Sequence, residues 1–393
     1  RSNVIFILSD DLSFADIGCY GQKQIRTPNV DRLAVEGMRF TQAYAGASIC
    51  APSRSCLITG KHLGHTRVRE HGQKLEDGSY QESLRPQDTT FGDVMKKAGY
   101  TTAAIGKWGV GIPGTLGVPY LRGFDYSYGF YDQIRAHSFY PEYVWRDDRP
   151  VILEGNAGFD MTRLYKSSSR RWSDEDDDED RNIYDGSGKL IPQGVADPAK
   201  AQNTYDLFEA EALEFIEKQA EQPFFLYLAF QNPHGPLVVP ELTPYKDAEW
   251  PSQRHKEWGA IITRMDTGIG RILDLLDSKG IADDTVVFFA SDNGYSCWGY
   301  FGMGRNEEVE FFDNKGPFRG SKFTLDGEAG IRVPLVARWP GRIEPGSETD
   351  QVVAFWDVLP TLAELAGADP TPDTDGISFL PTLTGGDQPQ HDY

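Results

Sequence analysis

Several short runs of apolar residues in this chain end directly in polar residues. The runs are Val4–Leu8 before Ser9-Asp10-Asp11, Thr102–Ile105 before Gly106-Lys107, Phe224–Phe230 before Asn232-Pro233-His234, and Val286–Ala290 before Ser291-Asp292-Asn293. Runs that are apolar at successive positions are typical of parallel strands buried on both faces. We therefore predict a parallel sheet whose strands end in polar side chains.

Helical patterns lie between these runs. In Trp258–Ser278 the apolar residues recur at helical spacing, and Gly280 follows as a stop signal. Further helices are predicted over Tyr205–Gln219, Phe91–Ala98 and Asp357–Ala366. Alternating strands and helices predict an α/β fold, with a large mixed, mainly parallel sheet sandwiched by helices. Ligands of such sheets bind beyond the carboxyl ends of the strands, so the polar residues there should meet in one cleft.

The remaining segments are interpreted as loops and an insertion. Thr115–Pro150 is rich in aromatic residues, glycine and proline, and we expect it to form loops over the cleft. We expect a catalytic domain over residues 1–385, with a polar, acidic insertion at 156–198. Residues 386–393 are interpreted as the start of a truncated C-terminal region, so a smaller C-terminal subdomain should be mostly absent from this sequence.

Composition narrows the class of protein. The formal net charge of −20 over 393 residues argues against a nucleic-acid partner, because phosphate binding needs a basic surface. No apolar stretch is as long as a membrane span. Residue 1 directly precedes a core strand, so we expect that a leader was removed and that the protein is periplasmic or secreted. The cysteines at 19, 50, 56 and 297 show no paired spacing, so no disulfide framework is expected.

Two adjacent carboxylates, Asp10 and Asp11, follow a buried strand directly. Such a pair is costly unless a cation or hydrogen-bond donors compensate it. Asp292 and Asn293 follow another strand and add oxygen ligands, which suit a hard cation such as Ca²⁺ or Mg²⁺. The first pair alone is equally compatible with a helix N-cap or a turn, whereas the second pair favours a metal site.

The segment from Cys50 to Arg54 predicts the start of a helix that ends at Gly60, because proline favours a first helical turn and glycine a helix end. Cys50 would then lie at a helix N-terminus, where anions are favoured. Arg54 adds a planar charge suited to a tetrahedral oxyanion. From these residues alone, Cys50 is either a thiolate of low pKa or an ordinary buried cysteine.

Cys50–Gly60 matches the sulfatase signature, C-x-P-S-R followed by x-x-x-[LI]-T-G. Other segments resemble sulfatase blocks in the order of that family, over almost the whole chain. They are Ser9-Asp10-Asp11, Thr27-Pro28-Asn29, Gly106-Lys107-Trp108, Pro233-His234-Gly235-Pro236, Ser291-Asp292-Asn293-Gly294, Arg319-Gly320-Ser321-Lys322 and Gly330-Ile331-Arg332-Val333-Pro334. The chain thus resembles the formylglycine-dependent (type I) sulfatases of the alkaline-phosphatase-like superfamily.

This resemblance implies that a formylglycine-generating enzyme oxidises Cys50 to formylglycine, which hydrates to a gem-diol. One hydroxyl would attack sulfur and the other would later expel sulfate. The implied ligands of one Ca²⁺ are Asp10, Asp11, Asp292, Asn293 and the modified residue at position 50. The implied sulfate-binding and catalytic residues are Arg54, Lys107, His234 and Lys322, of which the last two would protonate the leaving alcohol or stabilise its charge.

One position departs from the family pattern. The common block reads Gly-Lys-Trp-His-Leu-Gly, whereas residues 106–111 of this chain read Gly-Lys-Trp-Gly-Val-Gly. Gly109 therefore stands where the family has a histidine near the formylglycine hydroxyl. Either another group such as His137 takes over its role, or the metal and Lys107 suffice.

The segments around Gly109, Gly123–Tyr126 and Gln133–Pro141 resemble a branch of bacterial carbohydrate sulfatases active on galactose-configured sugars. The implied substrate is a sulfated oligosaccharide or polysaccharide, with the 4-sulfate of galactose or N-acetylgalactosamine favoured. We expect His137 and Arg135 to contact it, together with Lys107, His234 and Lys322, and Arg67, Arg69 and Arg135 to supply a local basic patch. Tyr128, Tyr131, Tyr140 and Trp145 would either stack on a pyranose or pack within loops.

Two other functions stay open. A phosphatase or phosphonate monoester hydrolase of the same superfamily would share the fold, but many of these enzymes use two zinc ions and additional histidine ligands. This chain has seven histidines, none of them in a block expected to bind metal, which favours one hard cation. A non-catalytic binding protein on a sulfatase fold is the second alternative, and Gly109 is the one argument for it.

Overall fold

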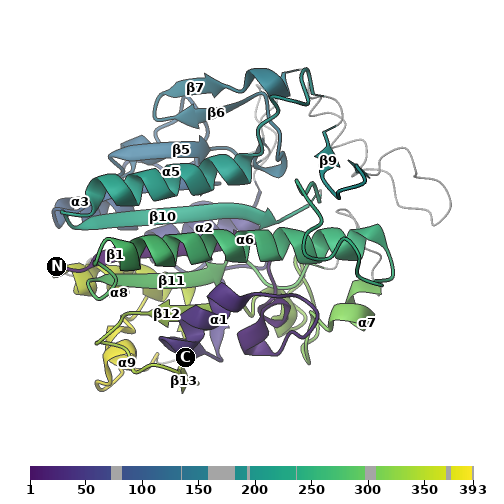
Figure 1. Cartoon of the computed structure of the whole chain (residues 1–393). Coiled ribbons are helices and arrows are strands. Elements are labelled where there is room, and N and C mark those ends of the chain that lie inside the picture. The colour runs from purple at the N-terminus through teal and green to yellow at the C-terminus, as the bar shows by residue number, and fades with distance from the viewer. Residues whose placement is uncertain are drawn as a thin grey trace.

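The computed structural model describes residues 1–71, 82–133, 135–157, 182–192, 195–235, 237–296, 307–368 and 373–391. In this part of the chain one large sheet lies between two layers of helices (Figure 1). Its ten strands follow the order β13-β2-β12-β11-β1-β10-β4-β5-β6-β7. Their bounds are β1 (Asn3–Asp10), β2 (Met38–Phe40), β4 (Thr101–Lys107), β5 (Tyr126–Phe130), β6 (Tyr143–Arg146), β7 (Arg149–Ile152), β10 (Phe224–Pro233), β11 (Thr285–Ser291), β12 (Leu335–Arg338) and β13 (Ser347–Thr349).

The centre of the sheet is parallel. β1 pairs in parallel with both β10 and β11, β4 pairs in parallel with β10, and β5 pairs in parallel with β4. β12, β6 and β7 join in antiparallel pairings. This mixed, mainly parallel sheet confirms the predicted fold class, and each of the four predicted strands forms with slightly wider bounds.

Both faces of the sheet are buried. Along β1, the side chains of Val4, Phe6 and Leu8 belong to one hydrophobic core, while Ile5 and Ile7 belong to the other. This alternation explains the uninterrupted apolar run, because successive side chains of a strand point to opposite faces.

The helices divide between these two cores. α2 (Cys50–Thr59), α3 (Phe91–Lys97), α8 (Val358–Ala366) and α9 (Leu380–Thr384) contribute to the core that contains Phe6. α1 (Pro28–Val35), α5 (Thr204–Gln219), α6 (Gln253–Ser278) and the short α7 (Glu307–Phe312) contribute to the other core, and α1, α5 and α6 lie in front of the sheet in Figure 1. The predicted helices therefore form and cover the sheet as expected.

The interpretation of Thr115–Pro150 as loops is wrong for part of the segment. The segment contains β5 and β6 and the first residues of β7, which extend the sheet beyond β4. Tyr128 and Phe130 of β5 are buried in the core beneath α5. Glycine and aromatic residues, which suggested loops, are here accommodated in strands because α5 covers them.

Most of the predicted insertion at 156–198 lies outside the described residues, including its acidic run. The described residues 182–192 form a hairpin of β8 (Ile183–Tyr184) and β9 (Leu190–Ile191). Elsewhere β3 (Ala43–Tyr44) and β14 (Val353–Ala354) pair as a second small sheet. Within the described part, no helix combines the length and apolar character needed to cross a bilayer. The proposed domain limits stay predictions.

Candidate active site

The carboxyl ends of the central strands gather the candidate residues at one edge of the sheet. Asp10 ends β1 and lies opposite Pro233 of β10, the residue before His234. Ser9 lies opposite Ser291, which places Asp292 and Asn293 beside the Asp10 pair. Lys107 ends β4, which lies on the far side of β10. The predicted convergence of polar strand ends is therefore present in the fold.

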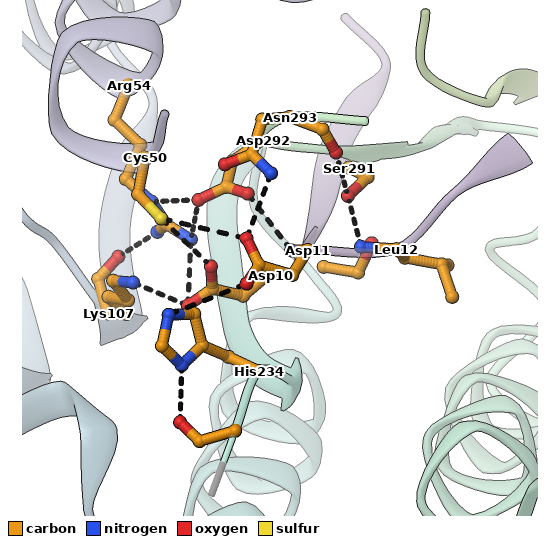
Figure 2. Close-up of polar contacts among 12 residues, drawn as sticks. Asp10, Asp11, Leu12, Cys50, Arg54, Lys107, His234, Ser291, Asp292 and Asn293 are labelled. Atoms are coloured by element: carbon orange, nitrogen blue, oxygen red, sulfur yellow. Dashed lines mark hydrogen bonds and ion pairs between the residues drawn. The ribbon is translucent and has the colours of Figure 1, made fainter. Parts of the chain in front are cut away.

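Cys50 begins α2, and its position follows from the local sequence. Pro52 occupies the first turn, and Gly60 ends the helix with a φ of 66°, a conformation that suits glycine. The Sγ atom of Cys50 lies 3.3 Å from Oδ1 of Asp10 and 3.9 Å from Oδ1 of Asp11 (Figure 2). Burial, with the negative charges of Asp10 and Asp292, raises the pKa of the unmodified thiol. The centre therefore does not activate Cys50 as a thiolate.

Three carboxylates and three cations form ion pairs around Cys50. Lys107 Nζ lies 2.5 Å from Asp10 Oδ2, Lys322 Nζ lies 2.6 Å from Asp11 Oδ1, and Arg54 Nε lies 2.9 Å from Asp292 Oδ2. Asp10, Asp11, Arg54, Lys107, Asp292 and Lys322 are each at most 3% exposed. Ionised groups buried this deeply persist only with partners of opposite charge.

The buried cations are held at fixed positions. Arg54 Nη1 donates a hydrogen bond to the Lys107 carbonyl oxygen at 2.5 Å, while its other side faces Asp292. Burial acts to lower the pKa of Lys322, but the combined negative charges around it, with Asp11 contributing most, raise it, so this side chain stays charged. Lys322 Nζ also lies 3.4 Å from Cys50 Sγ. Positive charge is therefore concentrated next to the residue at position 50.

Oxygen, sulfur and imidazole nitrogen atoms at this centre are arranged as a possible metal site. Ligand atoms of Asp10, Asp11, Cys50 and His234 lie within 4.8 Å of one another. Asn293 donates from Nδ2 to Asp11 Oδ1 at 2.9 Å. Its Oδ1 atom is buried and has no hydrogen-bond partner among the described residues. A buried amide oxygen in this situation is suited to bind a cation.

His62, His65 and Asp375 form a second cluster of possible metal ligands, also within 4.8 Å of one another. His65 Nδ1 lies 2.8 Å from Asp375 Oδ1. This cluster is partly exposed and follows the C-terminal end of α2, whereas Cys50 is at its N-terminal end. Two imidazoles favour a softer metal than calcium.

His234 and His137 stack with ring centroids 4.2 Å apart and an angle of 9° between their planes. His234 Nδ1 lies 2.6 Å from the Gly235 carbonyl oxygen, which can only accept, so Nδ1 carries hydrogen and Nε2 faces Asp11 at 3.6 Å. Burial and the charge of Lys322 lower the pKa of His234, and burial together with His234 lowers the pKa of His137. Both imidazoles are therefore neutral at pH 7.

Gly109 has a φ of 81° and lies against Arg54. A Cβ atom on Gly109 would lie 3.1 Å from Arg54 Cδ and 3.1 Å from Oε1 of the buried Gln133. The space beside the glycine is thus filled by Gln133. The sequence analysis placed this residue in the segment that resembles galactose-active sulfatases but gave it no role, because the sequence does not show that it reaches Gly109.

The three arginines predicted to supply a basic patch each have a partner in the structure, and the patch itself stays a prediction. Arg67 pairs with Asp88 at 2.5 Å, and Arg69 Nε donates to the Thr66 carbonyl oxygen at 2.9 Å. Arg135 is partly exposed and its guanidinium lies over the Tyr143 ring, with 4.3 Å from Cζ to the centroid. The role of Arg135 in binding substrate stays a prediction.

The aromatic residues proposed to stack on a sugar are mostly buried. Tyr128, Tyr131 and Tyr140 are 2–6% exposed, and Trp145 stacks on Tyr131 with centroids 6.0 Å apart. The alternative of internal packing is therefore correct for the three tyrosines. Tyr128 lies in β5, and Tyr131 and Tyr140 lie in the connection between β5 and β6, but all three rings are buried and not available to a ligand.

Two residues near the centre were missed by the sequence analysis. Lys322, Lys107, Asp11 and Asp292 act electrostatically on His71, and burial with the lysine charges lowers its pKa to about 3. Tyr227 of β10 is buried and interacts with Arg54. Tyr227 was hidden within an apolar run, and no motif marked His71.

Comparison with known proteins identifies the family. The Sulfatase family model matches residues 2–368. Steryl-sulfatase of Rattus norvegicus is 29% identical over 437 residues, which cover 98% of this chain and 70% of that protein. N-acetylgalactosamine-6-sulfatase of Canis lupus familiaris is 31% identical over 398 residues, which cover 98% of this chain and 66% of that protein. The crystal structure of Ps i-CgsB in complex with k-i-k-neocarrahexaose has 26% identity and a TM-score of 0.72, and the match covers 97% of this chain and 76% of that chain. This chain belongs to the sulfatase family and is a sulfuric ester hydrolase.

Proposed function

We propose that this protein removes sulfate from a sulfated carbohydrate, with a formylglycine at position 50 as nucleophile and one calcium ion beside it. The position of the Cys50 sulfur carries the proposal. Sγ lies between Asp10 Oδ1, at 3.3 Å, and Lys322 Nζ, at 3.4 Å. The nucleophile position, acidic ligands and fixed cations thus share one buried centre, as stabilisation of a developing anion requires.

The chemistry of the donor atoms fits a hard cation. Asp10, Asp11, Asp292 and Asn293 would hold calcium, because they offer carboxylate and amide oxygens. The Asn293 Oδ1 atom, which has no hydrogen-bond partner among the described residues, supports this assignment. When bound, calcium supplies positive charge that lowers the pKa of a hydroxyl next to it and attracts a sulfate oxygen.

The modification at position 50 is proposed from the signature Cys50–Gly60 and the burial of Cys50. A formylglycine-generating enzyme would be the partner that makes it. The hydrated aldehyde supplies two hydroxyls, one to attack sulfur and one whose deprotonation provides the route for sulfate release. We also propose a periplasmic or secreted location for the mature enzyme.

Formal charges at the centre favour an anionic substrate. The three carboxylates and three cations balance one another within the protein. A calcium ion adds two positive charges, which a sulfate ester would partly neutralise. Arg54, held by Asp292 and by the Lys107 carbonyl oxygen, presents a planar charge that needs little reorganisation when sulfate binds. Arg54 and Lys107 therefore position the sulfate oxygens.

Lys322 and His234 are placed to act on the leaving alcohol. Lys322 reaches to 3.4 Å from Cys50 Sγ, and His234 directs Nε2 toward the same centre. We assign protonation of the leaving oxygen, or stabilisation of its charge, to these two residues. Lys322 already carries a proton, whereas neutral His234 has none on Nε2 and must first take one up before it can act as the acid. We assign contact with the sugar next to the ester to His137, which stacks on His234.

We propose a galactose or N-acetylgalactosamine unit sulfated at O4 as the substrate. The resemblance around Gly109 and His137 supports the sugar, as do the relative that acts on N-acetylgalactosamine 6-sulfate and the neighbour solved with k-i-k-neocarrahexaose. The relative's name specifies the 6-position. We favour O4 because a histidine relocated to position 137 suits an axial ester, whose ring projects differently from that of an exocyclic ester.

A panel of position-defined sulfated sugars tests this substrate. The highest kcat/KM is expected for galactose or N-acetylgalactosamine 4-sulfate. Equal rates on gluco- and galacto-configured esters would overturn the sugar assignment and leave the sulfatase assignment intact. Faster hydrolysis of a phosphate or phosphonate monoester would favour the related hydrolase function. An unmodified Cys50 thiol after expression with a formylglycine-generating enzyme, seen by mass spectrometry, would favour a binding protein.

His137→Ala tests the specificity residue. Loss of a buried hydrogen-bonding group costs about 1–3 kcal/mol, so kcat/KM on the preferred sugar should fall by roughly tenfold or more. An aryl sulfate, which lacks the sugar hydroxyls, should be hydrolysed almost as fast as by the wild type. A similar loss on both esters would assign His137 to support of His234 instead.

A further inference from the structure

Phe323 is an exposed aromatic side chain beside the active centre. It directly follows Lys322, whose Nζ atom lies 5.4 Å from the centroid of its ring. The side chain is 49% exposed, and it is the aromatic one among the exposed large apolar side chains of the described residues. One exposed apolar side chain is ordinary on a protein surface. Phe323 differs from an ordinary exposed side chain in its backbone conformation and in the residues around it.

The backbone of Phe323 is strained. Its φ is 69°, in the left-handed region where a bulky residue is rarely found and where glycine would fit without cost. Hydrogen bonds fix the turn, since Phe323 N donates to the Ser48 carbonyl oxygen at 2.9 Å and Lys322 N to that of Tyr295 at 2.6 Å. Thr324 Oγ1 donates to the Ser321 carbonyl oxygen at 2.9 Å. Strain held in this way is found where the position of a side chain matters.

His71 packs against the same ring, with centroids 6.2 Å apart and an angle of 50° between the planes. The electrostatic influence of Lys322 and Asp11 on His71 shows that this imidazole lies near the active centre. Phe323 and His71 thus form an aromatic surface next to the catalytic groups. The tyrosines first proposed to bind the sugar cannot form such a surface because they are buried.

We propose that Phe323 is the stacking surface of the sugar subsite, with the C–H face of the sulfated pyranose lying on its ring and His71 holding that ring in position. This inference rests on the proposed function, because it specifies how the same site binds its carbohydrate. A pyranose has an apolar C–H face and a polar hydroxyl edge, so an aromatic ring next to a charged centre matches both parts. Lys322 then lies at the edge of the sugar that bears the ester.

Product inhibition separates the sugar subsite from the sulfate subsite. For Phe323→Ala we expect KM for the sulfated sugar and the inhibition constant of free galactose or N-acetylgalactosamine to rise by about threefold to tenfold. The inhibition constant of inorganic sulfate and kcat should stay close to the wild-type values. An equal rise for sulfate would mean that the change disturbs Lys322 and would overturn the inference, as would an unchanged KM.

Three further variants control for strain and for folding. Phe323→Gly removes the ring and relieves the positive φ, so its Tm should equal or exceed that of Phe323→Ala while its KM is raised as much. Phe323→Trp should keep KM near the wild-type value. Leu325→Ala removes a side chain that is 78% exposed two residues away and should change neither constant. A low KM for Phe323→Gly would show that the ring does not bind the sugar.

His71→Ala tests the positioning role in a double-mutant cycle. Because His71 acts through Phe323, its loss should raise KM by less than the loss of the ring, and His71→Ala combined with Phe323→Ala should be no worse than Phe323→Ala alone. Additive effects would overturn this role for His71. If the wild type hydrolyses aryl sulfates but no sulfated sugar, the proposed function fails and the inference fails with it. If it hydrolyses sugars and the variants behave as wild type, the inference fails alone.

Discussion

The side-chain oxygen Oε1 of Gln133 lies 3.1 Å from the point that a Cβ atom on Gly109 would occupy. Gln133 thus closes the space beside Arg54 where the common sulfatase block carries a histidine. The backbone at Gly109, with a φ of 81°, also disfavours any other residue. The departure at this position is therefore a rearrangement that involves two segments of the chain, and it does not leave a gap in the centre.

Gly109→Ala should destabilise the protein and reduce its activity. The positive φ alone costs about 1–2 kcal/mol for alanine, and the contacts with Arg54 and Gln133 add to this cost. Gly114→Ala is the matched control, because Gly114 has a φ of 89° and nothing within 4 Å of its Cβ position. Denaturant unfolding should show a larger loss for Gly109→Ala, and adding Gln133→Ala should restore part of the difference. Equal losses at both glycines would contradict the crowding.

Cys50→Ser should reduce turnover by about 10²-fold or more in a host that converts only cysteine, because a serine lacks the second hydroxyl that releases sulfate. Steady-state rates and intact mass would measure the loss and any trapped sulfated protein. Cys56→Ser, on the same helix, is the control, because the Cys56 side chain contacts the Gly46 carbonyl oxygen and has no proposed catalytic role. Sustained turnover by the Cys50→Ser protein would refute the mechanism.

Removal of calcium should abolish sulfatase activity, and calcium should restore it, because the three carboxylates, Asn293 and the formylglycine are its proposed ligands. Calcium should also raise the Tm of the wild type, and Asn293→Ala should weaken that rise. Asp375→Ala disrupts the second cluster of possible ligands and should leave the calcium response unchanged. Full activity in a thoroughly stripped protein would rule out the calcium site.

Lys322→Ala and His234→Ala should each reduce hydrolysis of the sugar ester, since loss of general acid catalysis typically costs ~10²–10⁴-fold. The loss should be smaller on an aryl sulfate, whose leaving group needs little protonation. Rates on a series of aryl sulfates of different leaving-group pKa would measure this dependence. If the hydrolysis rate of a variant falls by the same factor on every ester, the substituted residue binds sulfate and is not the general acid.

Asp266 of α6 should make stability depend on pH. Burial raises its pKa to about 6, although its carboxylate accepts hydrogen bonds from the backbone N–H groups of Asn29 and Val30. The folded state then binds a proton that the unfolded state, with a pKa of about 4, has lost. The free energy of unfolding should therefore fall by up to about 3 kcal/mol as pH rises from about 4 to above 6.

Urea unfolding of Asp266→Asn at several pH values tests this sign. The stability of the variant should rise relative to that of the wild type as pH increases through this range, because asparagine has no proton to lose. Asp274→Asn removes an exposed carboxylate from the same helix and serves as the control. If the difference between wild type and Asp266→Asn is constant from pH 4 to pH 7, the raised pKa is contradicted.

Local sequence determined the central fold. The run Val4–Leu8 became β1 because a short, uninterrupted apolar run suits a strand buried on both faces. Trp258–Ser278 became the longer part of α6 because its apolar residues recur at helical spacing. The meeting of Asp10, Lys107 and Asp292 also followed from sequence, since parallel strands place their carboxyl ends at one edge. The signature at Cys50 identified the family that the comparisons confirm.

Only the tertiary structure decided which aromatic rings are available to a ligand. Tyr128 and Tyr131 share their composition with surface loops, but they are buried because distant segments pack over them. Gln133 reaches the space beside Gly109 from another segment of the chain, and His71 reaches the ring of Phe323 across more than two hundred residues. The strained turn at Phe323 likewise depends on hydrogen bonds to Ser48 and Tyr295. Such contacts depend on how remote segments pack, and residue type and local periodicity carry no information about that packing.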